Sequence, residues 1–173
     1  PRCACCHSTC KRRLKTNSPA DCTKRNLSKK PMNSKNISIK LTSEKLSAQA
    51  CSDFVDDPSC GGISVFVGTV RNHSAGKKVT LLEFSAYGPM AVKEMTSIAK
   101  DVLSKFDVLK IAIHHAEGVL GIGDIPVVIA VAAAHRKAAF EACQFAIDTL
   151  KESVPIWKKE HFEDGEVWVN AHP

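Results

Sequence analysis

The sequence predicts one α+β domain, in which a mixed sheet packs against helices and part of the chain forms antiparallel hairpins. Three observations support this fold class. Several segments have the alternating or continuous apolar pattern of strands, two longer segments have helical periodicity, and some predicted strands follow one another without an intervening helix. The chain has 173 residues, of which 44% are hydrophobic, so it is long enough to bury an ordinary globular core.

Residues 1–35 are predicted to be a disordered basic extension without catalytic duty, and residues 36–173 the folded domain. The extension has too few large apolar groups to offset the entropy of ordering it. Residues 1–40 contain 11 of the 24 Lys and Arg residues and one acid, Asp21. The other 133 residues therefore carry 13 basic and 17 acidic groups, a net charge of −4, although the whole chain is at +6. This acidic balance weakens a nucleic-acid-binding interpretation of the domain.

Five of the eight cysteines lie in the extension, and the other three are scattered through the domain. Three scattered cysteines do not form a disulfide framework, so we expect a reducing compartment, the cytoplasm (cytosol). The segment CACCHSTC (3–10) resembles a set of zinc ligands, but its spacing matches no two-knuckle pattern, so no metal site is expected. A mitochondrial transit peptide is the alternative for this basic N-terminus, although clustered cysteines argue against it.

The first half of the domain is predicted to contain three strands and a short helix. Ile37, Ile39 and Leu41 alternate with polar residues in NISIKLT, which is typical of a half-buried strand. Residues 43–55 follow as a short helix that ends at DDPSCGG. The β-branched segment 63–70 and the segment 79–87 are predicted to pair as a hairpin with a long tip.

The second half alternates helices and strands before a closing hairpin. The predicted elements are a helix at 89–106, a strand at 108–115, a glycine-rich link at 116–124, a central strand at 125–134, a helix at 136–152 and a hairpin at 156–169. The strand at 125–134 is a continuous apolar run, which indicates burial on both faces. Apolar residues at helical spacing define the buried faces of the two helices. They are Val92, Met95, Ile98, Val102 and Leu103 in the first helix, and Phe140, Cys143, Ile147 and Leu150 in the second.

Cationic side chains stand at both ends of the second helix. His135 and Arg136 open it, where free N–H groups and the helix dipole favour an anion; the alternative is that His135 caps the helix and Arg136 is solvated. Lys151 lies in the last turn, where the dipole favours a cation for structural reasons. Arg136 and Lys151 are about 22 Å apart at 1.5 Å per residue, too far for one small ligand. Either the ends serve different purposes, or one site combines the ends of two copies in a homodimer.

Other polar side chains have both functional and structural interpretations. Arg71 follows a strand that contains Phe66 and Gly68, so it is either a ligand contact or an arginine in water at a hairpin tip. Lys158 and Lys159 lie on a strand, so at most one of them points into a given pocket. The sequence contains no P-loop and no dinucleotide fingerprint, and no Ser-His-Asp arrangement is evident.

Two histidines end the strand at 108–115. His114 and His115 are adjacent, so their side chains face opposite sides of the sheet, and at least one is predicted to be structural.

Three segments together resemble the catalytic (large) subunit family of molybdopterin synthase. They are FVGTVRNHSAGKKVTLLEFSAY, AAAHRKAAFEACQFAIDTLK and VPIWKKE followed by a later tryptophan, and the likeness runs from about Ile37 to Trp168. The resemblance implies a hammerhead-type α+β fold with an antiparallel hairpin subdomain. It also implies a central homodimer flanked by two small ubiquitin-like subunits, a heterotetramer.

The family's activity would be a sulfur transfer in molybdenum cofactor biosynthesis. Each small subunit would insert a Gly-Gly tail ending in a thiocarboxylate, and the enzyme would convert cyclic pyranopterin monophosphate to molybdopterin with that sulfur. The resemblance implies no metal and no organic cofactor, because the partner supplies the sulfur.

The resemblance also implies roles for individual residues. Lys151 would be the essential lysine near the inserted tail, and Lys158 the second catalytic lysine. Arg71, His135 and Arg136 would anchor the phosphate and the pterin, with the His-Arg pair coming from the opposite protomer. The implied substrate-binding residues are Thr69, Val70, Arg71, His135, Arg136, Lys151, Lys158, Lys159 and Glu160, and the implied pocket walls are Phe66 and Ile147.

This chain departs from the family pattern at two places. Ala116 follows His115 where the family often has arginine, and His172 lies near the C-terminus, where the family can offer an arginine to the neighbouring pocket. Two other functions remain as alternatives. A non-catalytic adaptor for a ubiquitin-like tail would have no evident need for both Lys151 and Lys158. A nucleic-acid binder would use the basic extension, with binding that depends steeply on salt.

Overall fold

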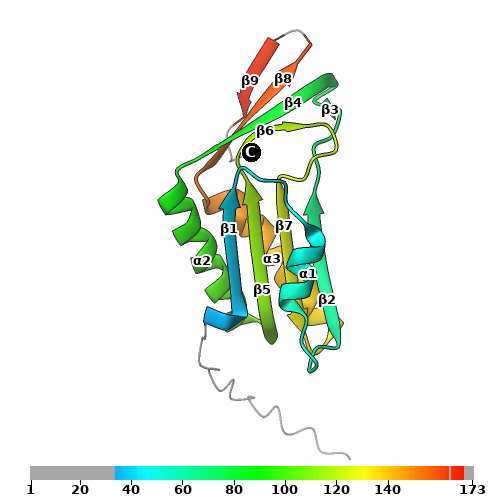
Figure 1. The fold of residues 1–173 in the computed structure, drawn as a ribbon, viewed down its shortest axis with the longest axis vertical. Coiled ribbons are helices and arrows are strands. Elements are labelled where there is room, and N and C mark those ends of the chain that lie inside the picture. The colour runs from blue at the N-terminus through cyan, green and yellow to red at the C-terminus, as the bar shows by residue number, and fades with distance from the viewer. Residues whose placement is uncertain (1–33, 164, 170–173) are drawn as a thin grey trace, which may run out of the picture.

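The computed structural model describes residues 34–163 and 165–169, which form two sheets and three α-helices (Figure 1). The predicted extension, its cysteine cluster and His172 lie outside the described residues, except that Ser34 and Lys35 belong to a short 3-10 helix, η1 (Ser34–Asn36). Among the described residues, no helix is long and apolar enough to cross a membrane.

The first sheet contains four strands in the order β1-β5-β7-β2. Their bounds are β1 Ile37–Thr42, β2 Gly62–Gly68, β5 Val108–Ala116 and β7 Val127–Ala133. β1 and β5 are parallel, whereas β5 and β2 both pair antiparallel with β7, so the sheet is mixed as predicted. Every residue of β7 is buried, which confirms the predicted central strand.

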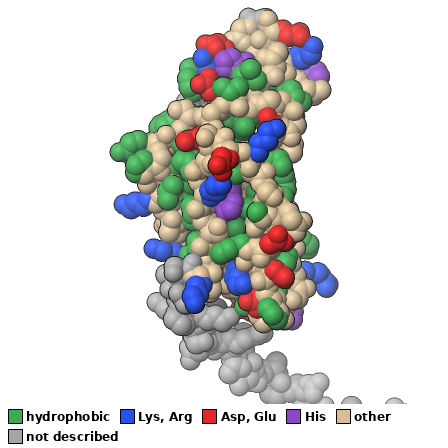
Figure 2. Space-filling model, in the orientation of Figure 1, with side chains coloured by type: hydrophobic (Ala, Val, Ile, Leu, Met, Phe, Trp, Pro, Cys, Tyr) green, Lys and Arg blue, Asp and Glu red, His purple; other side chains and the backbone are tan. Residues whose placement is uncertain are grey.

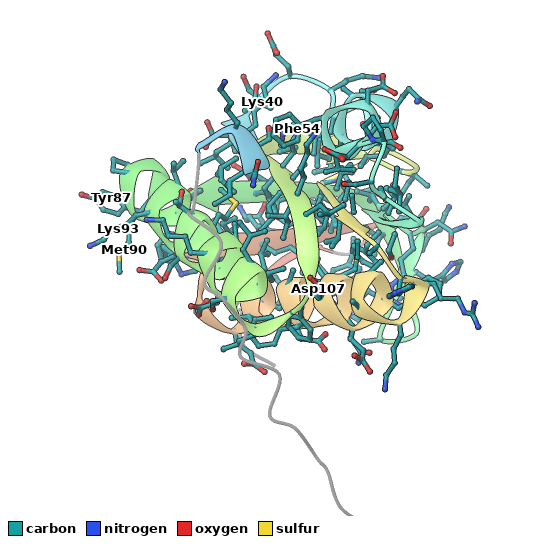
Figure 3. All side chains as sticks on the ribbon, turned by 90° about the horizontal axis from the view of Figure 1, so that it is seen from below. Lys40, Phe54, Tyr87, Met90, Lys93 and Asp107 are labelled. Carbon is teal, nitrogen blue, oxygen red and sulfur yellow. The ribbon has the colours of Figure 1, made fainter. Side chains whose placement is uncertain are left out.

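Helices cover both faces of this sheet. α2 (Gly88–Lys105) and α3 (Arg136–Ser153) lie on one face, and α1 (Ala48–Val55) lies on the other (Figure 3). Alternate residues of β7 supply the two cores: Ile129 and Val131 belong to the α2–α3 side, and Val128 and Ala130 to the α1 side. The apolar run of β7 is therefore explained by burial on both faces.

The second sheet is antiparallel throughout and lies beyond one end of the first (Figure 1). Its strands are β3 His73–Ser74, β4 Lys77–Ala86, β6 Gly118–Gly121, β8 Ile156–Phe162 and β9 Gly165–Val169. The predicted closing hairpin is confirmed as β8 and β9. A mixed sheet with helices and a separate antiparallel sheet confirm the predicted α+β class.

The predicted hairpin between 63–70 and 79–87 is wrong. β2 pairs with β7 along its whole length, from Gly62 opposite Ala133 to Gly68 opposite Val127, whereas β4 pairs with strands of the second sheet. The physical reason is that β7 is buried on both faces and needs a hydrogen-bonded strand at each edge. β2 supplies one of these edges and β5 the other, so the chain between β2 and β4 crosses from one sheet to the other.

The prediction of buried helix faces is wrong for two residues, which are exposed. Val92 in α2 is 39% exposed and Phe140 in α3 is 61% exposed. Small residues occupy the inner faces instead, and they let the helices approach the sheet and each other closely. They are Ala91 and Ala99 in α2, and Ala139, Ala142 and Ala146 in α3. The other predicted core positions of α3, Cys143, Ile147 and Leu150, are buried.

Two glycines allow the start of α3 to sit against the first sheet. A Cβ atom on Gly61 would lie 2.3 Å from the carbonyl oxygen of Ala134, and one on Gly62 would lie 3.3 Å from Cα of Arg136. A side chain at Gly61 would force the backbone apart, and one at Gly62 would make a tight contact. The glycines therefore position the turn that carries His135 and Arg136.

We predict that Gly61→Ala lowers the free energy of unfolding by about 1–3 kcal/mol, because the added methyl group forces the backbone apart. Urea denaturation would measure this loss. Gly121→Ala is the matched control, since its Cβ would meet Asp124 Oδ2 at an ordinary 3.5 Å, and it should change stability by less than about 0.5 kcal/mol. Equal stability of the two variants would contradict the packing argument.

Candidate functional site

A pocket of about 870 Å³ lies where the two sheets and the end of α3 meet. The first sheet lines the pocket with the last residues of β2 and β5 and the first residue of β7, and the second sheet lines it with residues of β4 and β8. Six of the predicted site residues line it: Phe66, Thr69, Arg71, Ile147, Lys151 and Lys158. These residues are separated by up to 92 positions in the sequence, from Phe66 to Lys158, so the fold brings them together.

Three cations face this pocket from three different elements. Arg71 follows β2, Lys151 lies in the last turn of α3, and Lys158 lies on β8. Among the described residues, no ion pair involves Arg71 or Lys151. Because these two cations have no ion-pair partner there, they remain available to an anionic ligand.

Glu160 holds Lys158 from behind the pocket. Its carboxylate is 5% exposed and lies 2.8 Å from Lys158 Nζ. Burial alone raises the pKa of Glu160, but hydrogen bonds from Lys158 and Ser74 and the charges of Lys158 and Arg71 outweigh it and lower the pKa below its ordinary value. Glu160 is therefore an ionised group that fixes Lys158, and it does not line the pocket itself.

Two other predicted contacts face away from the pocket. Lys159 is paired with Glu166 at 2.5 Å and lies over the ring of Trp168, on the opposite side of β8 from Lys158. Val70 is 2% exposed, and its backbone N–H and carbonyl are already bonded to Asp124 and Gly123. In this single chain, neither residue can reach a ligand that binds beside Lys158.

His135 and Arg136 lie at the far end of α3 and do not line this pocket. Both are exposed, and His135 makes no side-chain capping bond although it is the N-cap residue. His135 therefore occupies the N-cap position through its backbone carbonyl, which accepts from Ala139 N–H, and Arg136 is exposed, as the structural alternative predicted. Since α3 is a single continuous helix, the separation of about 22 Å between Arg136 and Lys151 holds in the structure.

Sequence reasoning missed His115 as a pocket residue. Its side chain lines the pocket, is 5% exposed and packs edge-on against Phe84, with ring centroids 5.4 Å apart. Nδ1 lies 2.7 Å from the carbonyl oxygen of Ala116, so it carries the proton and donates it there. Burial lowers the pKa of His115 to about 4, although the hydrogen bond to Ala116 acts in the opposite direction. The ring is therefore neutral at pH 7.

His114, on the other face of β5, is a structural histidine. Its ring nitrogens lie 2.9 Å from Ser38 Oγ and 3.1 Å from Cys51 Sγ. Burial raises the pKa of the Cys51 thiol to about 11, so the thiol remains protonated. This arrangement lacks the ionised sulfur of a nucleophilic cysteine and instead joins β1, α1 and β5.

Among the described residues, no group of three or more His, Cys, Asp or Glu side chains is arranged to hold a metal ion. On the face shown in Figure 2, acidic and basic side chains are interspersed rather than gathered by sign. This face therefore lacks the continuous basic surface typical of nucleic-acid-binding domains.

We predict that Glu160→Gln lowers the free energy of unfolding at pH 7 by about 1–3 kcal/mol, because a charge-assisted hydrogen bond is lost. The folded-state pKa of Glu160 is depressed, so its contribution is present above the ordinary value of 4.5 and disappears as the pH falls through the lowered pKa. Denaturation at several pH values should show that the free energies of unfolding of wild type and Glu160→Gln approach each other below pH 4.5.

Glu163→Gln is the control, since the Lys78–Glu163 pair is 61% exposed on both sides and should contribute little. A Glu160→Gln effect that is independent of pH would contradict the assignment of an ionised carboxylate.

Comparison with known proteins gives a family for the chain. The MoaE protein family model matches residues 41–153. The molybdopterin synthase catalytic subunit of Homo sapiens is 48% identical over 130 residues, which cover 75% of this chain and 69% of that protein. The subunit of the same name from Taeniopygia guttata is 50% identical over 131 residues, covering 75% and 84%.

A solved structure agrees with this match. The crystal structure of molybdopterin synthase from Staphylococcus aureus has a TM-score of 0.72 and 39% identity, and the match covers 75% of this chain and 95% of that one. The residues matched by the family model include Arg71, His115 and Lys151 and end before Lys158. From the family model and the identities to these relatives, we conclude that the chain belongs to the MoaE protein family.

Proposed function

We propose that the chain is the catalytic subunit of a molybdopterin synthase, a sulfurtransferase that acts in molybdenum cofactor biosynthesis. Its substrate is cyclic pyranopterin monophosphate, and its sulfur comes from the C-terminal thiocarboxylate of a small ubiquitin-like subunit. The observation that carries the proposal is the pocket, in which Arg71, Lys151 and Lys158 converge from three elements. The names of the relatives, each called a catalytic subunit, support it and imply a second subunit.

The charges of the pocket suit both ligands. A phosphate and a thiocarboxylate are anions, and the pocket has the volume of ordinary ligand sites. Three cations, Arg71, Lys151 and Lys158, line it together with two carboxylates, Asp148 and Glu152. Arg71 and Lys151 make no ion pair among the described residues and can bind these anions.

The thiocarboxylate sulfur bonds to a substrate carbon and displaces an oxygen group from it, which joins the partner's acyl carbon to the substrate as a thioester. Water then adds to the acyl carbon to give an oxyanion intermediate, and the acyl C–S bond breaks, so that the sulfur stays on the substrate as a thiolate and the partner ends in a carboxylate. Lys151 stabilises this oxyanion or moves its proton, and Lys158, held by Glu160, is the second catalytic lysine.

His135 and Arg136 enter the site from a second copy of the chain. β2 is the outer strand of the first sheet, so its free edge and its exposed side chains Ile63, Val65 and Val67 need a cover. Phe140 of α3, 61% exposed, lies on the other side of the sheet but borders the same edge strand, beside Ser64 and Phe66. A two-fold axis that pairs two α3 helices antiparallel places Arg136 of one copy beside Lys151 of the other.

The proposal also covers the assembly, the cofactor, the pocket walls and the location of the enzyme. The enzyme acts as a homodimer flanked by two small subunits, and the reaction uses no cofactor, since the partner supplies the sulfur. Thr69 and Phe66 form the wall beside Arg71, and Ile147 forms the wall beside Lys151. The free thiols of Cys51, Cys60 and Cys143 support a cytosolic location, where thiols stay reduced.

We predict that Lys151→Ala lowers single-turnover product formation at least about 100-fold, because a preorganised cation at the reacting group is lost. The assay combines the purified chain, thiocarboxylated small subunit and cyclic pyranopterin monophosphate. Lys100→Ala is the control: Lys100 is an exposed lysine on α2 and does not line the pocket. It should retain wild-type turnover.

Unfolding midpoints and binding of the small subunit should be equal for wild type and both variants. Wild-type turnover by a folded Lys151→Ala variant would contradict the catalytic role of this lysine. A wild-type chain that binds the small subunit but forms no product would instead be an adaptor.

A further inference from the structure

His115 has one ring nitrogen that no group of the protein uses. Nδ1 donates to the carbonyl of Ala116 at 2.7 Å, which leaves Nε2 as a bare acceptor. Among the described residues, the only fully buried side-chain nitrogen or oxygen without a hydrogen-bond partner is Nε2 of His161. Nε2 of His115 is therefore not sealed inside the protein, and the pocket that its side chain lines is the open space available to it.

The surroundings of His115 differ from those of the three cations. Phe66, Phe84 and Val127 line the same pocket and give this part of it an apolar wall. Phe84 also packs edge-on against the His115 ring and restricts its orientation. The pocket thus has a cationic part suited to an anion and an apolar part that contains a single, fixed acceptor.

A neutral acceptor in an apolar wall selects for a particular ligand group. An unprotonated ring nitrogen repels phosphate oxygens, and its low pKa, about 4, keeps it unprotonated at pH 7. It therefore requires an N–H or O–H donor. Lys158, the nearby cation on β8, already donates to Glu160 at 2.8 Å, so a ligand donor is the more suitable partner.

We propose that Nε2 of His115 accepts a hydrogen bond from a ring N–H of the substrate heterocycle and thereby orients that ring in the pocket. This inference rests on the proposed function, since a reduced pterin carries ring N–H donors and is fused to a phosphate-bearing ring. The cations hold the phosphate, and His115 discriminates between orientations of the heterocycle.

Three substitutions separate this contact from the structural role of the ring. His115→Asn keeps an N–H near the Ala116 carbonyl but removes the acceptor from the pocket. His115→Gln returns an amide oxygen close to the position of Nε2, and His115→Phe keeps only the ring shape. His114→Asn is the control on the opposite face of β5, where the ring bonds Ser38 and Cys51.

The measurement is calorimetric binding of cyclic pyranopterin monophosphate, and separately of inorganic phosphate, to the full chain. We expect His115→Asn and His115→Phe to raise the Kd for the substrate about tenfold, the equivalent of one hydrogen bond of about 1.4 kcal/mol. His115→Gln should stay within about threefold of wild type. Phosphate affinity should be unchanged in all three variants, and His114→Asn should bind both ligands as wild type does.

Two results would overturn the inference. One is substrate binding by folded His115→Asn or His115→Phe that equals wild type, and the other is an equal loss of phosphate and substrate affinity. If His115→Asn fails to fold, the comparison of His115→Gln with His115→Phe decides the question. A wild-type chain that neither binds nor converts the substrate would instead contradict the proposed function, so the two failures are distinguishable.

Discussion

The rigid length of α3 is the constraint on which the site depends. The helix packs against β2 and β7, starts where Gly61 and Gly62 let it approach the sheet, and ends at the pocket with Lys151. A continuous helix cannot bend its first residue back to its last, so the cations at its two ends cannot serve one ligand within one chain. Under the proposed two-fold arrangement, the partner covers the exposed apolar side chains at the β2 edge and Phe140 of α3, and it brings the opposite helix end to the pocket.

The charges beside the pocket depend on which side of β8 each charged residue faces. Lys158 and Glu160 are two residues apart on β8, so they share a side of the strand and pair with each other. Lys159, between them, points the other way and pairs with Glu166. The pair immobilises one cation in the pocket, while Arg71 and Lys151 make no ion pair among the described residues.

Much of the fold could be predicted from local patterns, because periodicity reports burial directly. The central strand, the two long helices and the closing hairpin are confirmed within a few residues. The pairing of β2 was predicted incorrectly, since alternation along 63–70 shows that a strand exists but not which strand completes the edge of β7. Phe140 was placed in the core because its spacing is helical, yet the small residues of α3 face the sheet and leave Phe140 on an apolar surface that the single chain does not cover.

The candidate site, too, could be predicted only in part from the sequence. Motif resemblance selected Arg71, Lys151 and Lys158, and the fold brings all three to one pocket. His115 was missed because adjacent strand residues face opposite sides, and only the position of the second sheet determines which of His114 and His115 meets the pocket. Ala116 is 1% exposed at the end of β5, and nothing in the structure explains why alanine replaces the family's arginine there.

We propose that Lys151 of one copy and Arg136 of the other complete one site, and mixed dimers can test this arrangement. Arg136→Ala and Lys151→Ala chains, coexpressed with different affinity tags, are purified through both tags and assayed for conversion of cyclic pyranopterin monophosphate. A mixed dimer contains one site with both residues intact and one with neither, so we expect about half of wild-type turnover although each variant alone is nearly inactive. Mixed dimers as inactive as the separate variants, or tags that do not copurify, would contradict a site shared between two copies of the chain.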